Sequence, residues 1–407
     1  MRKLSRWGVF VAGAAMFVSS FLDLESPGDY THFVAFGEAA LEGLVPYPDA
    51  ATGVAGPGGG PWATWPPGFV PLASLLARLD GMAHAPTVVS FQLLNLAMLA
   101  VALWVVVAWT TGRRPVSRSP DPDGRLQWDA PLVAVALLVP FRMVLSNFEH
   151  AQVNLVVLGL VLLGFYLLDR RPLAGGLLFG LGSAVKATPV ALLAYLAWRG
   201  RTRALAFAAG GVAVGWFGLP AMVLGPDGAV EWWRAWIGAL PHAAGQESWM
   251  NQSLRSVATL GFGPGPGDVA WMLGTAGLAI GIAAAFGRPF RAVGARRTAA
   301  EIAILLVAVT IVSPVSWKAH YVTLVPLCAA VLVLARRADR GRRRAGLVGL
   351  VIAGVGFNIT SPEIVGWAAM TWLEERGLVL WFALSLLALG LFLLPGGREV
   401  PEGASRA

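Results

Sequence analysis

The sequence predicts an all-α polytopic membrane protein, and three observations support this class. Of the 407 residues, 56% are hydrophobic and only 13% are charged. Apolar runs recur from one end of the chain to the other, and no stretch is polar enough for a separate soluble domain. The basic residues gather in short segments between those runs, as charges that set membrane topology do. We therefore expect one integral membrane domain over residues 1–407.

Twelve membrane crossings are expected, because about 20 apolar residues span the hydrocarbon core and shorter segments are tolerated inside a bundle. The fifth and sixth are separated at Thr188-Pro189, since proline breaks a helix. Short helices along the outer surface are also expected over 33–44 and 65–79, with an ordinary turn as the alternative for the second. The predicted crossings are 7–24, 87–109, 131–147, 151–168, 172–185, 188–198, 204–224, 268–287, 299–317, 321–335, 345–359 and 378–394.

The distribution of arginine predicts the topology. Most basic residues lie in segments that face one side if the amino terminus is inside, so the positive-inside rule places both termini and the tail 395–407 in the cytoplasm. The basic amino terminus followed by an apolar stretch also resembles a signal peptide, but the many later spans favour an uncleaved anchor. The long loops 25–86 and 225–267 then lie outside, and we expect the functional site there.

Several function classes are excluded by composition and motif content. Cys328 is the single cysteine and lies in an apolar run, which indicates a packing residue and excludes disulfides and cysteine-rich zinc sites. A formal net charge of +8 is compatible with nucleic-acid binding. The basic residues lie in the segments between the predicted helices, however, which argues against a nucleic-acid-binding surface. The cluster at 336–344 is therefore expected to contact anionic lipid. Neither a Walker-type loop nor a dinucleotide fingerprint is present.

Asp29 is the leading catalytic candidate. It lies a few residues beyond the expected end of the first span, where a carboxylate could point back into a cleft at the membrane surface. The alternative is that the acidic residues of this loop are solvated and its aromatic residues anchor the loop at the membrane interface, without a catalytic role.

Cationic candidates come from two later segments. Lys186 interrupts an apolar run, where a cation is costly unless it is paired or faces water, although a snorkelling lysine is the alternative. Lys318 and His320 lie with Trp317 at the outer junction of the ninth and tenth spans. A structural turn is the alternative there.

Amide-rich segments supply further candidates. Gln152 and Asn154 mark the outer junction of the third and fourth spans, where they could bind a ligand or cap helices. The segment Asn251-Gln252-Ser253-Leu-Arg255 combines amides, a hydroxyl and a guanidinium, which suit hydroxyl-rich or phosphate ligands.

In their order along the chain these segments resemble the polyprenol-phosphate-sugar-dependent glycosyltransferases of the membrane GT-C superfamily, specifically the family 87 mannosyltransferases. Ala151 replaces a usual glycine, Trp65 a usual tyrosine and Ala319 the first of two adjacent histidines. The matching segments are Asp29-Tyr30, Gly43 to Tyr47, Trp65-Pro66-Pro67, Gln152-Val-Asn154, Ala174-Gly175, Lys186-Ala-Thr188-Pro189, Asn251-Gln252-Ser253 and Ser313-Pro-Val-Ser316-Trp317-Lys-Ala-His320.

The resemblance implies a GT-C-type bundle whose site on the extracytoplasmic face moves a sugar, which is mannose in this family, from a polyprenyl-phosphate donor to a glycolipid or glycan hydroxyl. It implies no metal and no other cofactor. Asp29 would act as the base of an inverting displacement. The donor phosphate would be bound by Lys186, Arg255, His320 and Lys318. Substrate contacts would come from Tyr30, Trp65, Gln152, Asn154, Asn251, Gln252, Ser253 and Trp317.

Other functions remain open at this level. A polyprenyl-phosphate-arabinofuranose-dependent transferase would use the same type of lipid carrier. A secondary transporter would also suit twelve crossings with broken helices, although no internal repeat is evident and the acids lie in an outer loop. A structural scaffold fits poorly with so many polar groups at the helix junctions of one side.

Overall fold

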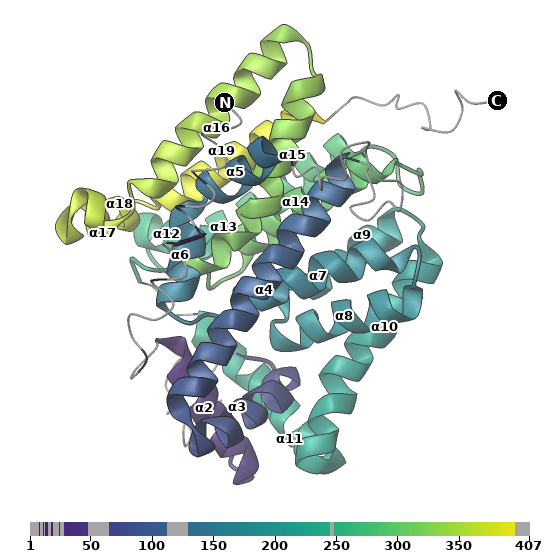
Figure 1. Cartoon of the computed structure of the whole chain (residues 1–407), viewed down its shortest axis with the longest axis vertical. Coiled ribbons are helices and arrows are strands. Elements are labelled where there is room, and N and C mark those ends of the chain that lie inside the picture. The colour runs from purple at the N-terminus through teal and green to yellow at the C-terminus, as the bar shows by residue number, and fades with distance from the viewer. Residues whose placement is uncertain are drawn as a thin grey trace.

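The computed structural model describes residues 28–47, 65–111, 129–244 and 248–394, together with a few isolated positions before residue 28. Within these ranges the chain is helical throughout, as Figure 1 shows, which confirms the predicted all-α class. The first predicted crossing, 7–24, lies outside the described residues apart from isolated positions. The tail 395–407 lies outside them as well.

The helices follow one another with short connections. In chain order they are α2 (Asp29–Leu41), η1 (Pro67–Phe69), α3 (Val70–Met82), α4 (His84–Thr111), α5 (Ala130–Leu138), α6 (Phe141–Glu149), α7 (Asn154–Leu168), α8 (Pro172–Val185), η2 (Thr188–Ala191), α9 (Leu192–Trp198), α10 (Thr202–Ala213), the π-turn η3 (Val214–Gly218), α11 (Leu219–Ala244), α12 (Leu254–Phe262), α13 (Pro266–Phe286), α14 (Ala295–Val312), η4 (Lys318–Thr323), α15 (Leu324–Arg337), α16 (Arg340–Asn358), α17 (Pro362–Val365), α18 (Trp367–Glu375) and α19 (Leu378–Leu393).

Length and composition make the chain a multi-pass membrane protein. Among the described residues, four helical stretches are long and apolar enough to cross a membrane: His84–Thr110, Thr202–Leu240, Pro266–Phe286 and Lys318–Arg337. The number rises to six if α5 with α6, and α18 with α19, each form one broken span. There are three shorter apolar helical segments: α7 is largely buried, whereas α8 and η2 with α9 each keep exposed residues. The predicted number of twelve crossings stays a prediction.

Proline explains where two apolar runs break. The predicted helix break after Lys186 is confirmed, because α8 ends at Val185, Lys186 is extended at φ −143° and ψ 125°, and η2 begins at Thr188. The run predicted as one crossing over 131–147 contains two helices, α5 and α6, bent by 64° around Pro140, and their forming one crossing stays a prediction. Pro140 indicated this break, but the apolar residues on both sides of it favoured one continuous helix.

Of the two predicted outer loops, only the second contains more helix than expected. The first carries α2 and α3, close to the two short helices predicted for it. The second, 225–267, contains the latter part of α11 and all of α12. Gly225, at φ 74° and ψ 164°, is not helical and kinks α11 into two parts. Glycine adopts this conformation readily because it has no Cβ.

The core of the bundle is formed by α14 and α15, with α4 packed against both. Ile304, Val307, Leu324 and Cys328 are fully buried, which confirms Cys328 as a packing residue. Helix α8 packs between α7 and α10. A Cβ on Gly211 of α10 would lie 1.8 Å from the carbonyl oxygen of Gly176, so close backbone approach requires glycine there.

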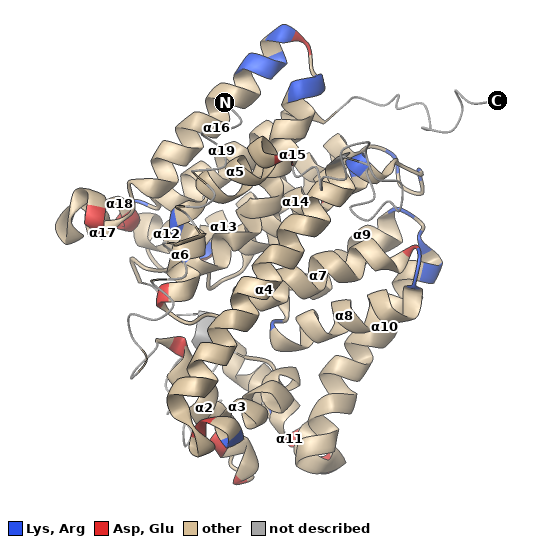
Figure 2. Cartoon of the chain, in the orientation of Figure 1, with Lys and Arg blue, Asp and Glu red and all other residues tan. Residues whose placement is uncertain are grey.

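Charges separate along the molecule. In Figure 2, Lys and Arg gather at the α15–α16 turn and at the α9–α10 and α13–α14 turns, whereas Asp and Glu lie mainly toward α2, α3, α11 and α17–α18. Two arginines near the α9–α10 and α13–α14 turns are buried and not solvated. Arg199 and Arg297 both pair with the fully buried Glu301, which also accepts a 2.8 Å hydrogen bond from the Tyr195 hydroxyl.

Candidate active site

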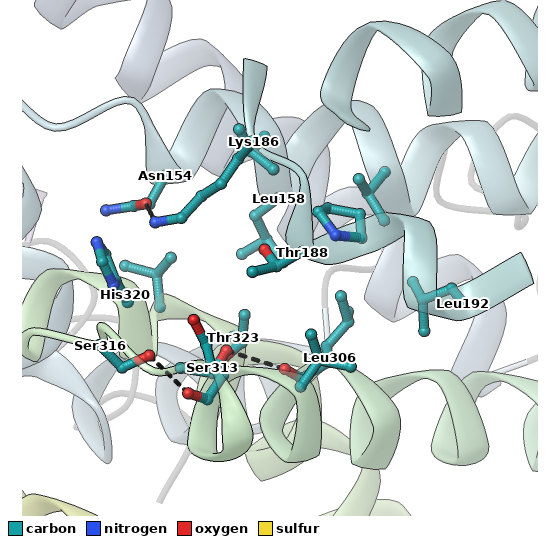
Figure 3. A pocket seen from close by; sticks show the side chains of 16 residues that line it. Asn154, Leu158, Lys186, Thr188, Leu192, Leu306, Ser313, Ser316, His320 and Thr323 are labelled. Atoms are coloured by element: carbon teal, nitrogen blue, oxygen red, sulfur yellow. Dashed lines mark hydrogen bonds between the residues drawn. The ribbon is translucent and has the colours of Figure 1, made fainter. Parts of the chain in front are cut away.

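A pocket opens where α7, the α8–η2 break, α14 and η4 meet. Lys186, Asn154 and His320 form its polar end together with hydroxyl groups, as Figure 3 shows. Leu192 and Leu306 lie at the opposite end in that view, and Val157, Val161 and Val309 add to an apolar wall. A charged end joined to an apolar wall suits a ligand that has an anionic head and a hydrocarbon chain.

Lys186 reaches into this pocket because the chain leaves helical geometry there. Its ammonium group donates a 2.7 Å hydrogen bond to Oδ1 of Asn154, the first residue of α7. An ammonium group has three donors, so this contact leaves others for an anion. The lysine predicted from its costly position in an apolar run therefore lies in the pocket.

His320 lies on η4 on another side of the pocket. The backbone N–H of Trp317 donates to His320 Nδ1 at 3.3 Å, and the two rings are parallel with centroids 6.4 Å apart. Because Nδ1 accepts, Nε2 carries the proton in the neutral ring. Trp317 thus orients His320, and it does not line the pocket.

Asp29 is half-buried at the first position of α2, where the loop after α6 holds it. Its backbone N–H donates to the carbonyl oxygen of His150 at 2.9 Å. The preceding Gly28 is left-handed at φ 54°, and a Cβ on it would lie 2.8 Å from the Cα and carbonyl oxygen of His150. Glycine at this position allows α2 to begin against that loop.

Two amides connect Asp29 to the pocket. Gln152 Nε2 donates to Asp29 Oδ2, and Asn154 Nδ2 donates to Gln152 Oε1 at 3.2 Å. Asn154 in turn accepts from Lys186, so a continuous chain of hydrogen bonds runs from the ammonium group to the carboxylate. Asp29, Gln152, Asn154, Lys186 and His320, which are distant in sequence, therefore meet in one region.

The environment of Asp29 acts on its ionisation in both directions. Burial raises the pKa of its carboxyl above the usual value, because a charged carboxylate loses solvation. Electrostatic interactions with His150, His32 and Lys186 and the hydrogen bond from Gln152 oppose that rise. The group is thus a carboxylate whose basicity is increased while nearby donors still favour its ionised form.

Tyr30 and Trp65 belong to an aromatic cluster beside Asp29. Tyr30 is fully buried, and its hydroxyl donates to Asp80 Oδ1 at 2.8 Å, where His84 also binds. Trp65 is half-buried against Phe33, with ring centroids 5.1 Å apart. These contacts position α2 on α3 and α4, and a substrate contact by either ring stays a prediction.

The segment Asn251 to Ser253 is buried and makes protein contacts. Asn251 Oδ1 accepts from the backbone N–H of Ser316 at 2.9 Å, and Gln252 Nε2 donates to the carbonyl oxygen of Glu374 at 2.8 Å. The Ser253 hydroxyl donates to Pro314 O and caps α12 by accepting from Ser256 N. These contacts anchor the loop that carries η4. Their predicted role in binding substrate is untested.

Arg255 and Lys318, predicted as phosphate ligands, do not line the pocket. Arg255 forms a 2.7 Å ion pair with Asp268. Lys318 forms a 2.6 Å ion pair with Glu374, which is almost fully buried on α18. Lys318 and His320 lie two positions apart on the same short 3₁₀ helix, so their side chains point in different directions. A direct phosphate contact by Lys318 stays a prediction.

Some pocket residues carry no signal in the sequence. Thr310 and Thr323 line the pocket and contact each other through their hydroxyls at 3.0 Å. A threonine in an apolar helix usually bonds its own backbone, as Thr310 does to Leu306, so nothing in the pattern marks it. Asp80 was also missed, because an acid in a predicted surface loop looks like a solvated group.

Comparison with known proteins identifies similar chains. The model of Glycosyltransferase family 87 matches residues 63–314. A polyprenol-phosphate-mannose-dependent alpha-(1-2)-phosphatidylinositol mannoside mannosyltransferase of Mycolicibacterium smegmatis is 29% identical over 337 residues, which cover 80% of this chain and 73% of the relative. The protein of the same description from Mycobacterium tuberculosis is 30% identical over 344 residues, covering 80% and 75%. No solved structure matches the chain significantly.

The matched family region includes Gln152, Asn154 and Lys186 of the site. It begins after Asp29 and ends before His320. The roles of these two residues are therefore argued from their geometry in this chain.

Proposed function

Because the chain belongs to glycosyltransferase family 87, it is a membrane hexosyltransferase that uses a polyprenol-phosphate sugar, and we propose that it transfers mannose to a phosphatidylinositol mannoside. The donor and acceptor are proposed from those of the two relatives, which share about 30% identity with this chain over 80% of its length. The observation that carries the proposal is the connection of Asp29 to the Lys186 pocket through two amides.

The pocket supports a lipid-phosphate donor. Lys186 and His320 present donors to an anionic group, and charge-assisted hydrogen bonds of this kind are roughly twice as strong as neutral ones. The apolar wall formed by Val157, Leu192 and Leu306 suits the first isoprene units of the carrier. The phosphate is then bound at the polar end with the sugar directed toward Asp29.

We infer a single inverting displacement. The acceptor hydroxyl oxygen attacks the anomeric carbon, the bond from that carbon to the phosphate oxygen breaks, and the hydroxyl proton passes to the Asp29 carboxylate. Polyprenyl phosphate leaves with the electron pair of the broken bond. Lys186 and His320 stabilise the charge that develops on it, and their effect is larger at low local dielectric.

The site is proposed to lie on the extracytoplasmic face. The turns that carry clustered arginine lie away from α2 and α3 in Figure 2, and the positive-inside rule assigns such turns to the cytoplasm. Addition of membrane-impermeant donor or acceptor analogues to sealed vesicles of known orientation tests this assignment.

Replacement of Asp29 tests the function directly. In proteoliposomes supplied with polyprenol-phosphate-mannose and a phosphatidylinositol mannoside, Asp29→Asn is expected to lose transfer while still inserting and binding donor. The matched control is Asp227→Asn, which alters an exposed carboxylate of α11. Near-normal turnover by Asp29→Asn would remove this carboxylate from the mechanism.

The same assay distinguishes the alternatives. A product formed only from polyprenyl-phosphate-arabinofuranose would assign the chain to that donor, and substrate flux without a glycosyl product would indicate a transporter.

A further inference from the structure

Gln152 and Asn154 occupy the space between the proposed base and the proposed phosphate ligand, and both amides are almost fully buried. Each side-chain polar atom of the two residues has a partner within the protein. Gln152 contacts Asp29 and Asn154, whereas Asn154 contacts Gln152, Lys186 and the carbonyl oxygen of Ala319 at 3.2 Å. A buried amide with every group satisfied has a defined orientation, because a flip would leave several groups unpaired.

The partners at the ends determine the direction of this chain. The Ala319 carbonyl can only accept and the Lys186 ammonium can only donate, so Asn154 must direct its NH₂ toward Ala319 and its oxygen toward Lys186. The same NH₂ also donates to Gln152 Oε1, which leaves the NH₂ of Gln152 for Asp29. Asp29 therefore meets a donor and Lys186 meets an acceptor.

We propose that Gln152 and Asn154 are positioning residues that hold Asp29 as an oriented carboxylate and couple it to the charged Lys186. This inference rests on the proposed function and assigns the two amides a role other than direct substrate contact. A donor hydrogen bond favours the carboxylate over the acid, and an acceptor favours the ammonium over the amine. The chain thus favours together the two charge states that transfer requires.

Ala319 extends the coupling to η4. Its carbonyl sets the orientation of Asn154, and its neighbour His320 lines the pocket. A shift of η4 would therefore disturb both the phosphate ligands and the orientation of the base. The backbone of η4 and the two amides form one connected network around the reacting groups.

The pH dependence of transfer distinguishes positioning from a structural role. Among the described residues, the charged groups that act on Asp29 are His150 at the end of α6, His32 of α2 and Lys186 after α8. Gln152→Met retains the length of the side chain and removes the donor to Asp29. The carboxylate is then harder to ionise, so the acid limb of kcat/KM is expected to move to higher pH by about one unit.

The matched control is Gln92→Met. Gln92 is equally buried on α4 and donates to the carbonyl oxygen of Phe148 at 2.9 Å, without contact to Asp29. This variant is expected to lose stability and to keep the acid limb of the unmodified protein. A purely structural role for Gln152 predicts the same behaviour for both variants.

Asn154→Asp is the second variant, chosen because it preserves shape and therefore folding. Its carboxylate would form an ion pair with Lys186 and so compete with the donor phosphate for the ammonium group. It would also remove the NH₂ group that donates to Gln152 Oε1. KM for polyprenol-phosphate-mannose is expected to rise about tenfold, together with an upward shift of the acid limb.

An unchanged acid limb in Gln152→Met, or in Asn154→Asp if the first variant does not insert, overturns the coupling and leaves the proposed transferase intact. Full activity of Asp29→Asn would instead overturn the proposed function itself, so the two failures are distinguishable.

Discussion

Gly28→Ala is expected to lower the transfer rate about tenfold or more without altering any group that reacts. Gly28 precedes Asp29 and lies against the loop after α6, where a Cβ would approach the Cα and carbonyl oxygen of His150 to 2.8 Å. That same carbonyl accepts the backbone N–H of Asp29 at 2.9 Å. Any movement that relieves the clash therefore displaces the proposed base.

The size of the displacement follows from the contact distance. Ordinary van der Waals contact begins near 3.4 Å, so the two segments have to separate by about 0.6 Å. A misplacement of about 1 Å can lower a rate by roughly 10²-fold, and a loss of about tenfold or more is expected here. The backbone of Gly28, at φ 54° and ψ −123°, lies outside the regions allowed to a residue with a Cβ, which adds about 1–3 kcal/mol of strain for alanine.

Gly43→Ala separates the clash from the strain. Gly43 follows the same helix at φ 73°, and a Cβ there would meet nothing within 4 Å. Both variants are expected to unfold at lower temperature, whereas only Gly28→Ala should lose mannosyl transfer per folded molecule. Equal transfer rates for the two purified variants in proteoliposomes would refute the positioning of Asp29 by this contact.

Two further variants test the pocket and the buried charges. Lys186→Ala and His320→Ala should each lower kcat/KM for the lipid-phosphate donor by about ten- to hundredfold, since each removes a charged or strong donor, while Arg376→Ala at an exposed site should not. Unchanged donor kinetics in both pocket variants would show that the phosphate site is misassigned. Glu301→Gln leaves two buried guanidinium groups without their carboxylate and should lower the unfolding free energy by about 3–5 kcal/mol, against about 1 kcal/mol or less for Asp169→Asn, whose side chain is 69% exposed; equal thermal shifts would contradict the buried pairing.

Local chemistry accounts for what the sequence predicted well. Apolar runs exclude any structure other than helices in a membrane, so the helical class and the positions of α4, α8, α13 and α19 follow from composition. The cost of a cation in an apolar segment marked Lys186, and the proline after it marked the break. Asp29 was singled out by its place beyond an apolar run, and its catalytic role stays a prediction.

Contacts between residues that are distant in sequence could not be predicted from the sequence alone. Arg199 and Arg297 belong to the basic segments that predict the topology, but both side chains are buried and pair with Glu301. Lys318 and His320 looked equivalent as phosphate ligands, but the 3₁₀ geometry of η4 directs Lys318 to Glu374 and His320 to the pocket.

The sequence alone therefore determined which segments are helices and which side chains are too costly to bury without a purpose, because both depend on the free energy of single residues in an apolar solvent. Only the tertiary structure decided which of those side chains meet. The contact of Gln152 with Asp29 and of Asn154 with Lys186 depends on the packing of α2, α7 and α8. Hydrogen bonds act over about 3 Å, and such distances between segments exist only once the bundle is packed.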